Sequence, residues 1–531
     1  MPLWRICFAV SDNLYNLLCQ RFPPDLSQVF LETPEGLRYS YRDLDRQTAV
    51  YAAFLTEKGL AKGDRLLAQV DKSPQALMLC LACIRAGLIF VPLNPAYQKA
   101  ELRHMLLDST PSAVICRPEA LREISTLLRE LENDFPHPRI ATLDEQGQGT
   151  LAELSDGTPP EFQTAICAAS DVAALMYTSG TTGRPKGAMI THGNLAANIA
   201  ALHDTWRWRP TDVLLHSLPV FHFHGLFIAC LTALFGSTKI LFLPKFDAAA
   251  VIERLPQATV FMGVPTYYTR LLERPDFGKD TCRTMRLFIS GSAPLLEQTF
   301  LEFERRTGFR VLERYGMTEA GVITSNPVDG ERVAGMVGTP LPGVSLRIVD
   351  PSRARKGAGQ TGSIPSSGHV GEVEIQGENV FAGYWRKPDD NAACFTADGF
   401  FQTGDLGRWE PNGYLSIVGR QKDLVITGGL NVYPKEVELA LDQIEGVAES
   451  AVIGVPHPDF GEAVVAVVIR QSGFPSLTET SLLIRLKEVL ANYKVPKRVF
   501  FADDFPRNTL GKVQKNALRE QPRYSVWATE K

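Results

Sequence analysis

A loop of small and hydroxylated residues, 178–183, is the feature that most constrains this sequence. An apolar run of strand length, residues 173–177, precedes the loop, and the apolar residues 188–190 follow it. Glycine has no Cβ, so backbone N–H groups in such a loop can approach phosphate oxygens, and serine and threonine hydroxyls add donors. Lys186 adds a positive charge. The pattern predicts a phosphate-binding loop, although a plain surface hairpin can share its composition.

The loop differs from the two common nucleotide-binding signatures. The Walker A pattern places its lysine between a glycine and a serine or threonine, whereas Lys186 stands between Pro185 and Gly187. The loop also lacks the GxGxxG spacing of dinucleotide-binding folds. A phosphate site at this loop therefore belongs to another class of protein.

Segments of strand and helix length alternate through the first part of the chain. Apolar strands are expected at residues 65–70, 88–95 and 113–116, with helices at about 77–86 and 99–107 between them. Strands that alternate with helices predict a largely parallel sheet with right-handed crossovers. The first half of the chain is therefore expected to be of the α/β class.

The pattern of predicted helices and strands changes later in the chain. Residues 335–383 are rich in glycine and proline and contain short alternating segments, which favours a β-rich region such as a small barrel. The last hundred residues alternate two helices with three strands and predict a small α+β domain. We therefore expect a large N-terminal domain over residues 1–419, with helix-flanked sheets and a small β-barrel, and a C-terminal α+β domain over residues 420–531.

Composition excludes several functional classes. The net charge of −4 gives no indication of nucleic-acid binding. No apolar run reaches about 18 residues, so no membrane span is expected. The first 11 residues are mildly apolar but too short for a secretory signal. Nine scattered cysteines argue against a disulfide framework and for a reducing, cytoplasmic compartment. Cys80 and Cys83 lie in an apolar helical stretch and are expected to pack in the core.

Two histidines, His222 and His224, stand two residues apart after a predicted strand. Such a pair can contribute to a metal site, but no third ligand lies nearby in the sequence. A metal centre at these histidines would therefore need ligands from distant segments.

Several segments match, in order, the signatures of the adenylate-forming superfamily, which includes acyl-CoA synthetases, adenylation domains of peptide synthetases and luciferases. The matching segments are YTSGTTGRPKG at 177–187, ERYGMTE at 313–319, TGDLG at 403–407, GRQKD at 419–423 and PRNTLGK at 506–512. Together they span nearly the whole chain, and their combination is specific although no single segment is. The sequence therefore resembles a member of this superfamily.

The resemblance implies a two-step reaction with ATP, Mg²⁺ and coenzyme A. A carboxylate attacks the α-phosphorus of ATP to give an acyl-adenylate and pyrophosphate, and a thiol then displaces AMP. Cations and N–H donors must neutralise the charge that accumulates. By the resemblance, the ATP-binding residues would be Thr178, Ser179, Gly180, Thr181, Thr182, Gly183, Lys186, Gly291, Ser292, Ala293, Glu313, Arg314, Tyr315, Gly316, Met317, Thr318, Asp405, Arg420 and Lys512.

The resemblance also implies separate roles within this set. Glu319, with Thr178, would hold Mg²⁺ through oxygen ligands. Tyr315 would stack on adenine, with the segment 291–293 against the other face of the base. Asp405 would accept hydrogen bonds from the ribose hydroxyls.

Catalysis and conformational change are assigned mainly to the C-terminal region by the same resemblance. The candidate catalytic residues are Lys512, Thr178, Glu319 and His222. Lys422 would be the hinge of a mobile lid, whose swing would exchange Lys512 for the glycines Gly428 and Gly429 of the coenzyme A channel. Superfamily members are often silenced by acetylation of this lysine, so an acetyltransferase and a deacetylase are expected partners. Monomer and dimer both stay open.

The segments around residues 221–225, 262–270 and 285–295 look most like those of malonyl-CoA synthetases. Malonate has a second carboxylate, so its pocket should hold a cation, and a guanidinium can grip a carboxylate with two hydrogen bonds. The candidates for this contact are Arg286 first, then His222, Arg270 and Ser290. Phe223 and Met317 would narrow the pocket and favour a short acid.

Alternatives to this interpretation concern both one residue and the whole function. Arg286 could simply begin a strand, because a basic residue stands there in many relatives that use neutral fatty acids. The nearest alternative function is a synthetase for another short or medium acid, such as methylmalonate, acetate or an aryl acid. A luciferase-like oxidation has no specific support, and a peptide-synthetase module is disfavoured because no carrier domain follows Lys531. An inactive nucleotide sensor is disfavoured because the charged site residues are all present.

Overall fold

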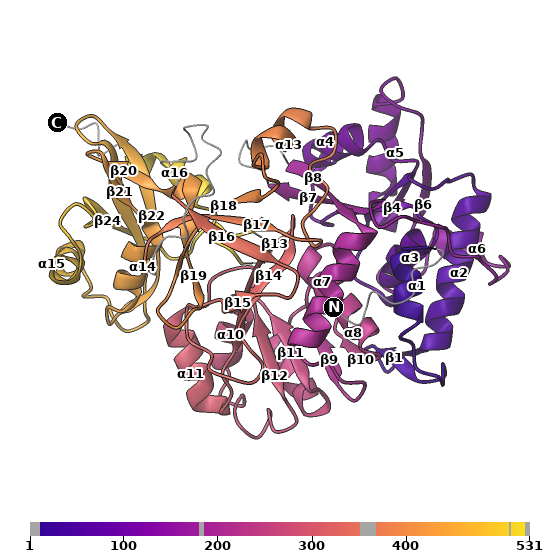
Figure 1. Cartoon of the computed structure of the whole chain (residues 1–531), viewed down its shortest axis with the longest axis horizontal. Coiled ribbons are helices and arrows are strands. Elements are labelled where there is room, and N and C mark those ends of the chain that lie inside the picture. The colour runs from indigo at the N-terminus through magenta and orange to yellow at the C-terminus, as the bar shows by residue number, and fades with distance from the viewer. Residues whose placement is uncertain (1–10, 180–184, 351–367, 509–510, 526–531) are drawn as a thin grey trace. The chain divides into compact units, whose positions relative to one another are not determined.

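The computed structural model describes residues 11–179, 185–350, 368–508 and 511–525 (Figure 1). The chain divides into two compact units. Unit 1 consists of Met1–Ser345 and Gln376–Gly399, and unit 2 consists of Leu346–Ile375 and Phe400–Lys531. Unit 2 thus begins before the boundary at residues 419 and 420 that the sequence suggests, and that boundary stays a prediction for the lid domain.

A six-stranded sheet forms the first part of unit 1, with strand order β6-β5-β3-β4-β7-β8. The bounds are β3 (Arg65–Gln69), β4 (Ile89–Pro92), β5 (Ala113–Cys116), β6 (Arg139–Thr142), β7 (Val172–Ser179) and β8 (Pro185–Thr191). Neighbouring strands are parallel except for β7 and β8, which form an antiparallel pair. The parallel α/β sheet predicted from the sequence is confirmed, since β3, β4 and β5 lie where strands were expected.

Helices connect and cover these strands. Their bounds are α1 (Leu14–Cys19), α2 (Tyr41–Glu57), α3 (Pro74–Arg85), α4 (Lys99–Ser109), α5 (Leu121–Glu130) and α6 (Thr150–Ser155). Helix α3 begins at Pro74 because the Ser73 side chain accepts a hydrogen bond from the Ala76 N–H at 3.2 Å and proline suits the first turn. Cys80 and Cys83 of α3 are fully buried, which confirms the core packing expected for them.

A nine-stranded sheet forms the second part of unit 1, with strand order β15-β14-β13-β12-β11-β9-β10-β1-β2. The bounds are β1 (Val29–Glu32), β2 (Arg38–Ser40), β9 (Val213–His216), β10 (Lys239–Phe242), β11 (Val260–Gly263), β12 (Leu287–Ser290), β13 (Leu312–Met317), β14 (Gly321–Ser325) and β15 (Thr339–Pro340). The six strands from β1 to β13 in this order pair in parallel, and the outer strands β2, β14 and β15 are antiparallel. The parallel strands end at one edge, so their last residues gather there.

The helices of this part are α7 (His192–Thr205), the π-helix η3 (His224–Leu231), α8 (Thr232–Phe235), α9 (Ala248–Arg254), α10 (Pro265–Leu272), α11 (Glu297–Thr307) and α13 (Pro388–Cys394). Helix α7 begins after Thr191, whose hydroxyl accepts a hydrogen bond from the Asn194 N–H at 3.1 Å, while the Asn194 side chain accepts from the Thr191 N–H at 2.9 Å. This reciprocal capping satisfies two backbone donors at the helix start. Helix α7 therefore begins directly after β8.

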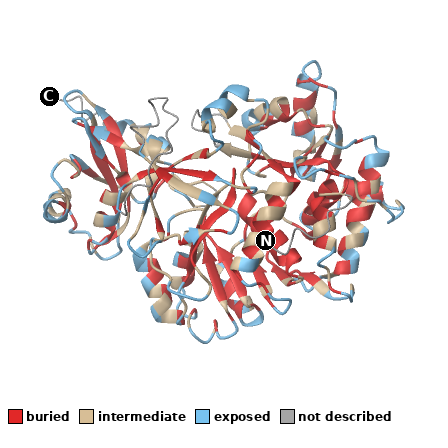
Figure 2. Ribbon diagram, viewed as in Figure 1, coloured by how far each residue is buried: buried red, intermediate tan, exposed pale blue. Residues whose placement is uncertain are grey.

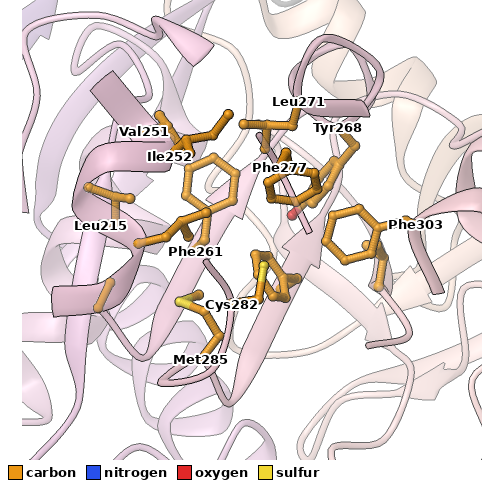
Figure 3. Close-up of a cluster of buried hydrophobic side chains, with 14 of the residues drawn as sticks. Leu215, Val251, Ile252, Phe261, Tyr268, Leu271, Phe277, Cys282, Met285 and Phe303 are labelled. Carbon is orange, nitrogen blue, oxygen red and sulfur yellow. The ribbon is translucent and has the colours of Figure 1, made fainter. Parts of the chain in front are cut away.

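An aromatic core lies between the nine-stranded sheet and the helices α9, α10 and α11 (Figure 3). Phe303 of α11 packs edge to face against Phe288 of β12, with ring centroids 4.9 Å apart, and against Tyr268 of α10, at 5.4 Å. The Tyr268 hydroxyl donates to the Ile289 carbonyl at 2.6 Å, so this buried polar group is paired. The cluster fixes α10 and α11 against the strands whose ends carry site residues.

Unit 2 contains two sheets. The first follows the order β16-β17-β18-β19, with bounds β16 (Ser345–Val349), β17 (Gly371–Gln376), β18 (Phe401–Trp409) and β19 (Leu415–Arg420). The second has the order β21-β20-β23-β22 with β24 beside β23, and its bounds are β20 (Val425–Thr427), β21 (Leu430–Val432), β22 (Val447–His457), β23 (Gly461–Arg470) and β24 (Arg498–Phe501). The β-rich region predicted from the sequence is confirmed, and its closure into a barrel stays a prediction.

The helices of unit 2 are α14 (Pro434–Asp442), α15 (Glu479–Val489), α16 (Lys515–Arg519) and α17 (Pro522–Ser525), with the short 3-10 turn η5 (Gln421–Asp423). The alternate residues Val464, Ala466 and Val468 of β23, with Val447 and Val452 of β22, pack in one cluster with residues of α14 and α15. The helices and strands predicted after residue 430 are confirmed.

Buried residues concentrate on the strands of both units (Figure 2). None of the described helices has the length and apolar character needed to cross a membrane.

The aromatic core yields a stability prediction. Phe303→Ala should lower the free energy of unfolding by about 3–5 kcal/mol, because the buried ring leaves a cavity that its neighbours fill only in part. Urea denaturation followed by circular dichroism measures the loss. Leu301→Ala on the same helix is the control, since Leu301 is 53% exposed and should change stability by roughly 0.5 kcal/mol or less. Equal losses for the two variants would contradict the assigned core.

Candidate active site

The antiparallel pair β7 and β8 holds the two ends of the glycine-rich loop. Thr178 pairs with Lys186 and Ser179 pairs with Pro185, so the last described residues on the two sides of the loop lie opposite one another. The Tyr177 hydroxyl donates to Asp108 at 2.8 Å and anchors the strand to α4. Gly180, Thr181, Thr182 and Gly183 lie outside the described residues, as does the side chain of Ser179, so their contacts with phosphate stay predictions.

Lys186 projects from β8 toward α13. Its ammonium lies 2.6 Å from a carboxylate oxygen of Asp390 and 5.4 Å from the centre of the Tyr384 ring. The segment that carries Tyr384 runs beside β8, because the Trp385 N–H donates to the Gly187 carbonyl at 2.8 Å. The cation of the loop is therefore held next to an acidic residue that sequence motifs did not identify.

Glu319 and Thr178 come together although 141 residues separate them in the sequence. The Thr178 hydroxyl donates to the Glu319 carboxylate at 3.5 Å, and the Tyr384 hydroxyl donates to the same oxygen at 2.9 Å. Burial, and then the Glu319 charge, raise the pKa of the Tyr384 hydroxyl, so it remains a proton donor. A carboxylate and a hydroxyl are oxygen ligands of the kind that Mg²⁺ prefers, so these residues fit the metal that the sequence predicts.

Ser290 ends β12 at the carboxyl edge of the nine-stranded sheet, and residues 291–293 follow it. A Cβ on Gly291 would lie 2.3 Å from Nε of Arg314, so only glycine leaves room for that guanidinium. Ser292 adopts a left-handed backbone with φ of +73°, and its hydroxyl lies 3.2 Å from Nδ1 of His224. Strained backbone of this type is typical of functional sites. The predicted adenine-facing role of residues 291–293 stays a prediction.

The segment 313–318 forms the end of β13 and the turn after it. Glu313 accepts a hydrogen bond from the Gly335 N–H at 3.0 Å and anchors a neighbouring turn. Tyr315, Gly316, Met317 and Thr318 are partly exposed, as ligand-contacting residues can be. A Cβ on Gly316 would lie 2.1 Å from the Gly321 carbonyl, so the close approach of β13 to β14 requires this glycine. Contact of these residues with ATP stays a prediction.

Arg314 belongs to the set that the resemblance assigns to ATP binding, and that role stays a prediction. Its side chain is buried, and its Nε and Nη2 atoms have no hydrogen-bond partner among the described residues. Burial lowers the pKa of Arg314 to about 10, so the guanidinium keeps its charge at neutral pH. The register pairs Ser290 with Glu313, which places Arg314 one residue beyond Ser290 at the carboxyl edge. The Ser290 hydroxyl also lacks a partner among the described residues.

The histidines near Arg314 are neutral. Burial, and then the Arg314 charge, lower the pKa of His224 well below its usual value. Burial lowers the pKa of His222 to about 4. His222 can therefore offer a hydrogen bond at neutral pH but no positive charge. The described residues contain no group of three or more His, Cys, Asp or Glu that could hold a metal ion.

Arg286, the first candidate for the second carboxylate, lies at the opposite end of β12. Its Nε and Nη2 donate to the two Asp212 oxygens at 2.9 and 2.6 Å, and Nη1 donates to the Trp206 carbonyl at 3.1 Å. The four residues of β12 place Arg286 about 13 Å from Ser290 along the strand. This geometry favours the alternative that Arg286 stabilises the start of the strand. Arg270, on α10, is exposed and forms no ion pair within the described part of the chain.

Unit 2 brings three predicted residues together. Asp405 of β18 and Arg420 of β19 are register partners, with Nε of the arginine 2.7 Å from the carboxylate. The backbone of Lys512 is held by Asn508, whose side chain accepts from its N–H at 3.0 Å. Although the Lys512 side chain as a whole is exposed, desolvation of its ammonium and the nearby Arg420 charge lower its pKa to about 8. The nearby negative charge of Asp405 acts in the opposite direction and raises the pKa of Lys512.

The predicted hinge and coenzyme A residues are also in unit 2. Lys422 lies in the turn η5 directly after β19. Gly428 and Gly429 form the turn between β20 and β21 with φ of +56° and +77°, a conformation that favours glycine. The Gly428 N–H donates to the Phe460 carbonyl at 2.9 Å. Their predicted functions in lid movement and coenzyme A binding stay predictions.

Two family models match this chain. The model described as AMP-binding enzyme matches residues 19–385, and the model described as AMP-binding enzyme C-terminal domain matches residues 436–512. A mitochondrial malonate–CoA ligase of Mus musculus is 35% identical over 91% of this chain and 87% of its own length. A feruloyl-CoA synthase of Amycolatopsis is 34% identical over 92% and 94%. Relatives that act on different acids are thus about equally similar.

A solved structure is more similar than either of these relatives. The ATP-bound crystal structure of MatB from Rhodopseudomonas palustris is 48% identical, covers 97% of this chain and 99% of its own, and superposes with a TM-score of 0.92. The chain therefore belongs to the AMP-binding enzyme family, the adenylate-forming superfamily indicated by its sequence motifs.

Proposed function

We propose that this protein ligates malonate to coenzyme A, with ATP as the energy source and an acyl-adenylate as the intermediate, releasing AMP and pyrophosphate. The membership of the AMP-binding enzyme family supports the reaction type. The likeness to MatB and to malonate–CoA ligases supports the acid. The single observation that carries the choice of acid is the buried Arg314 guanidinium, two of whose nitrogens have no partner among the described residues.

A dicarboxylic acid suits this pocket better than a monocarboxylic acid. A buried charge without a partner is costly, whereas a carboxylate can accept two hydrogen bonds from one guanidinium. The second carboxylate of malonate would pair with Arg314. An acid with one carboxylate must leave this cation unpaired while its own carboxylate reacts. The difference in binding free energy between a dicarboxylic and a monocarboxylic acid would make the enzyme selective for malonate.

In the first step a malonate carboxylate attacks the α-phosphorus of ATP and pyrophosphate leaves. The neutral histidines His222 and His224 can offer hydrogen bonds near the acid without binding a proton at neutral pH. Lys186 and the loop N–H groups would bind the β- and γ-phosphates, and Lys512 would supply charge to the α-phosphate. Asp405, paired with Arg420, would accept the ribose hydroxyls.

Mg²⁺ is the metal expected for this chemistry, and Glu319 and Thr178 would hold it. When bound, it would neutralise part of the triphosphate charge. Tyr384 would keep the Glu319 carboxylate oriented, because its hydroxyl donates to that group at 2.9 Å.

In the second step the sulfur of coenzyme A attacks the acyl carbon and AMP leaves. Movement about Lys422 would withdraw Lys512 and bring Gly428 and Gly429 to the site, where the absence of side chains would let the pantetheine arm pass. Acetylation of Lys512 would remove its charge and stop the first step.

The acid pocket gives the first functional prediction. Arg314→Met should lower kcat/KM for malonate by about two orders of magnitude, because a charged hydrogen-bond partner contributes roughly 3 kcal/mol. The value for acetate should change little. The measurement is pyrophosphate release with malonate, methylmalonate, acetate, butyrate and benzoate in the presence of ATP, Mg²⁺ and coenzyme A.

Arg286→Met is the matched control for this experiment. It removes the same charge from an ion pair with Asp212, so we expect a less stable protein that retains its preference for malonate. Loss of the preference in Arg286→Met but not in Arg314→Met would contradict the assigned pocket. If the wild-type protein had a higher kcat/KM for a monocarboxylate than for malonate, malonate would not be the substrate.

Lys512 gives a prediction about pH. Its pKa of about 8 lies below the usual lysine value, so the ammonium is present below pH 8 and is lost as the pH rises through 8. The rate of acyl-adenylate formation should therefore fall above pH 8, while Lys512→Arg, which keeps its charge, should show no such fall. Pyrophosphate release in single-turnover experiments measures this step. An unchanged wild-type rate between pH 7 and pH 10 would refute the role of the ammonium.

A further inference from the structure

Asp390 faces the cation of the phosphate-binding loop. The distance between its carboxylate oxygen and the Lys186 ammonium is 2.6 Å, and the Lys186 side chain is only 11% exposed. Asp390 lies on α13, more than 200 residues after the loop, and no motif in the sequence points to it. In Figure 1, α13 lies beside β7 and β8 within unit 1.

The carboxylate of Asp390 is held in this place. Asn391, the next residue, clamps the Tyr384 backbone by accepting from its N–H at 2.6 Å and donating to its carbonyl at 3.0 Å. Tyr384 in turn forms a backbone bridge with Ala188 of β8. Helix α13 is thus attached to the same strand that carries Lys186, so the ion pair is part of an ordered corner of unit 1.

A triphosphate that binds Lys186 must compete with this contact. The ammonium can bind a phosphate oxygen only by sharing its donors with Asp390 or by leaving it, and a phosphate placed close to Asp390 meets a like charge. The carboxylate therefore opposes nucleotide binding while it satisfies the buried ammonium in the absence of nucleotide.

We propose that Asp390 sets the affinity of the nucleotide site: its carboxylate is the resident counter-ion of Lys186, and ATP binding exchanges this carboxylate for a phosphate. The inference rests on the proposed function, in which Lys186 is a phosphate ligand. Asp390 acts through Lys186 and is a positioning residue rather than a catalytic one.

The test is the affinity for Mg²⁺–ATP without acid or coenzyme A, so that no turnover occurs. Asp390→Asn keeps the size of the side chain and removes its charge, and it should bind ATP about three- to tenfold more tightly than the wild-type protein, in line with the strength of a partly exposed ion pair. Isothermal titration calorimetry gives the dissociation constants. In steady-state assays the KM for ATP should fall while the KM for malonate stays the same.

Asp389→Asn is the matched control. Asp389 is the exposed neighbour on the same helix, so its substitution changes the net charge equally without touching Lys186. Its effect on the ATP dissociation constant should be less than about twofold. A second comparison places Asp390→Asn in a Lys186→Met background, where it should no longer tighten ATP binding.

Weaker or unchanged ATP binding by Asp390→Asn, with an unchanged melting temperature, would overturn the inference. So would an equal gain from Asp389→Asn, because the effect would then come from net charge alone. These results are distinct from a failure of the proposed function, which would be the absence of AMP and acyl-CoA formation by the wild-type protein with every acid in the panel. The inference can therefore fail while the ligase assignment stands.

Discussion

The hydrogen bonds that meet at Glu319 join the parts of unit 1 on which the nucleotide site depends. One carboxylate oxygen accepts from Thr178 at the end of β7 and from Tyr384, which follows a strand-like segment beside β8. Glu319 itself follows β13 of the nine-stranded sheet. The six-stranded sheet, the nine-stranded sheet and the segment before α13 thus share a single buried acid. Because a buried carboxylate needs such partners, the junction that orients Glu319 also fixes the two sheets around it.

The charged groups of the site are buried to different degrees and satisfied in different ways. The Arg286 guanidinium donates hydrogen bonds to both carboxylate oxygens of Asp212 and to the Trp206 carbonyl. Such a paired cation suits a role in stabilising the protein. Lys186 has an acidic partner that a ligand could replace. Arg314 is fully buried, and two of its nitrogens have no partner among the described residues. An uncompensated buried charge destabilises a fold, and in the proposed function the second carboxylate of the substrate would supply the partner that these two nitrogens lack.

Local patterns in the sequence predicted the elements well but not the distant contacts. The strands around residues 65–116 and the helices and strands of the last hundred residues follow from apolar periodicity, which acts over a few positions. Tyr384 contacts Glu319 across 65 residues and Asp390 contacts Lys186 across 204, so no window of sequence joins them. Motif resemblance identified Thr178, Lys186 and Glu319 as site residues, but it says nothing about the side chains that hold them in place.

The choice between Arg286 and Arg314 shows a further limit of sequence reasoning. Both arginines border buried strands, and a pattern of residue types does not show which end of a strand faces a site. In parallel strands, function gathers at the carboxyl edge, where Arg314 lies beside Ser290 and His224, whereas Arg286 precedes β12 at the amino edge. The Arg314 charge also depresses the pKa of His224, so near neutral pH a charged guanidinium lies near a neutral imidazole. His222 and His224 gain no proton in the physiological pH range and Arg314 does not lose one, so these three side chains keep the same charge there. In the proposed site, recognition of the second carboxylate would therefore depend on the geometry around Arg314 rather than on a change in its charge.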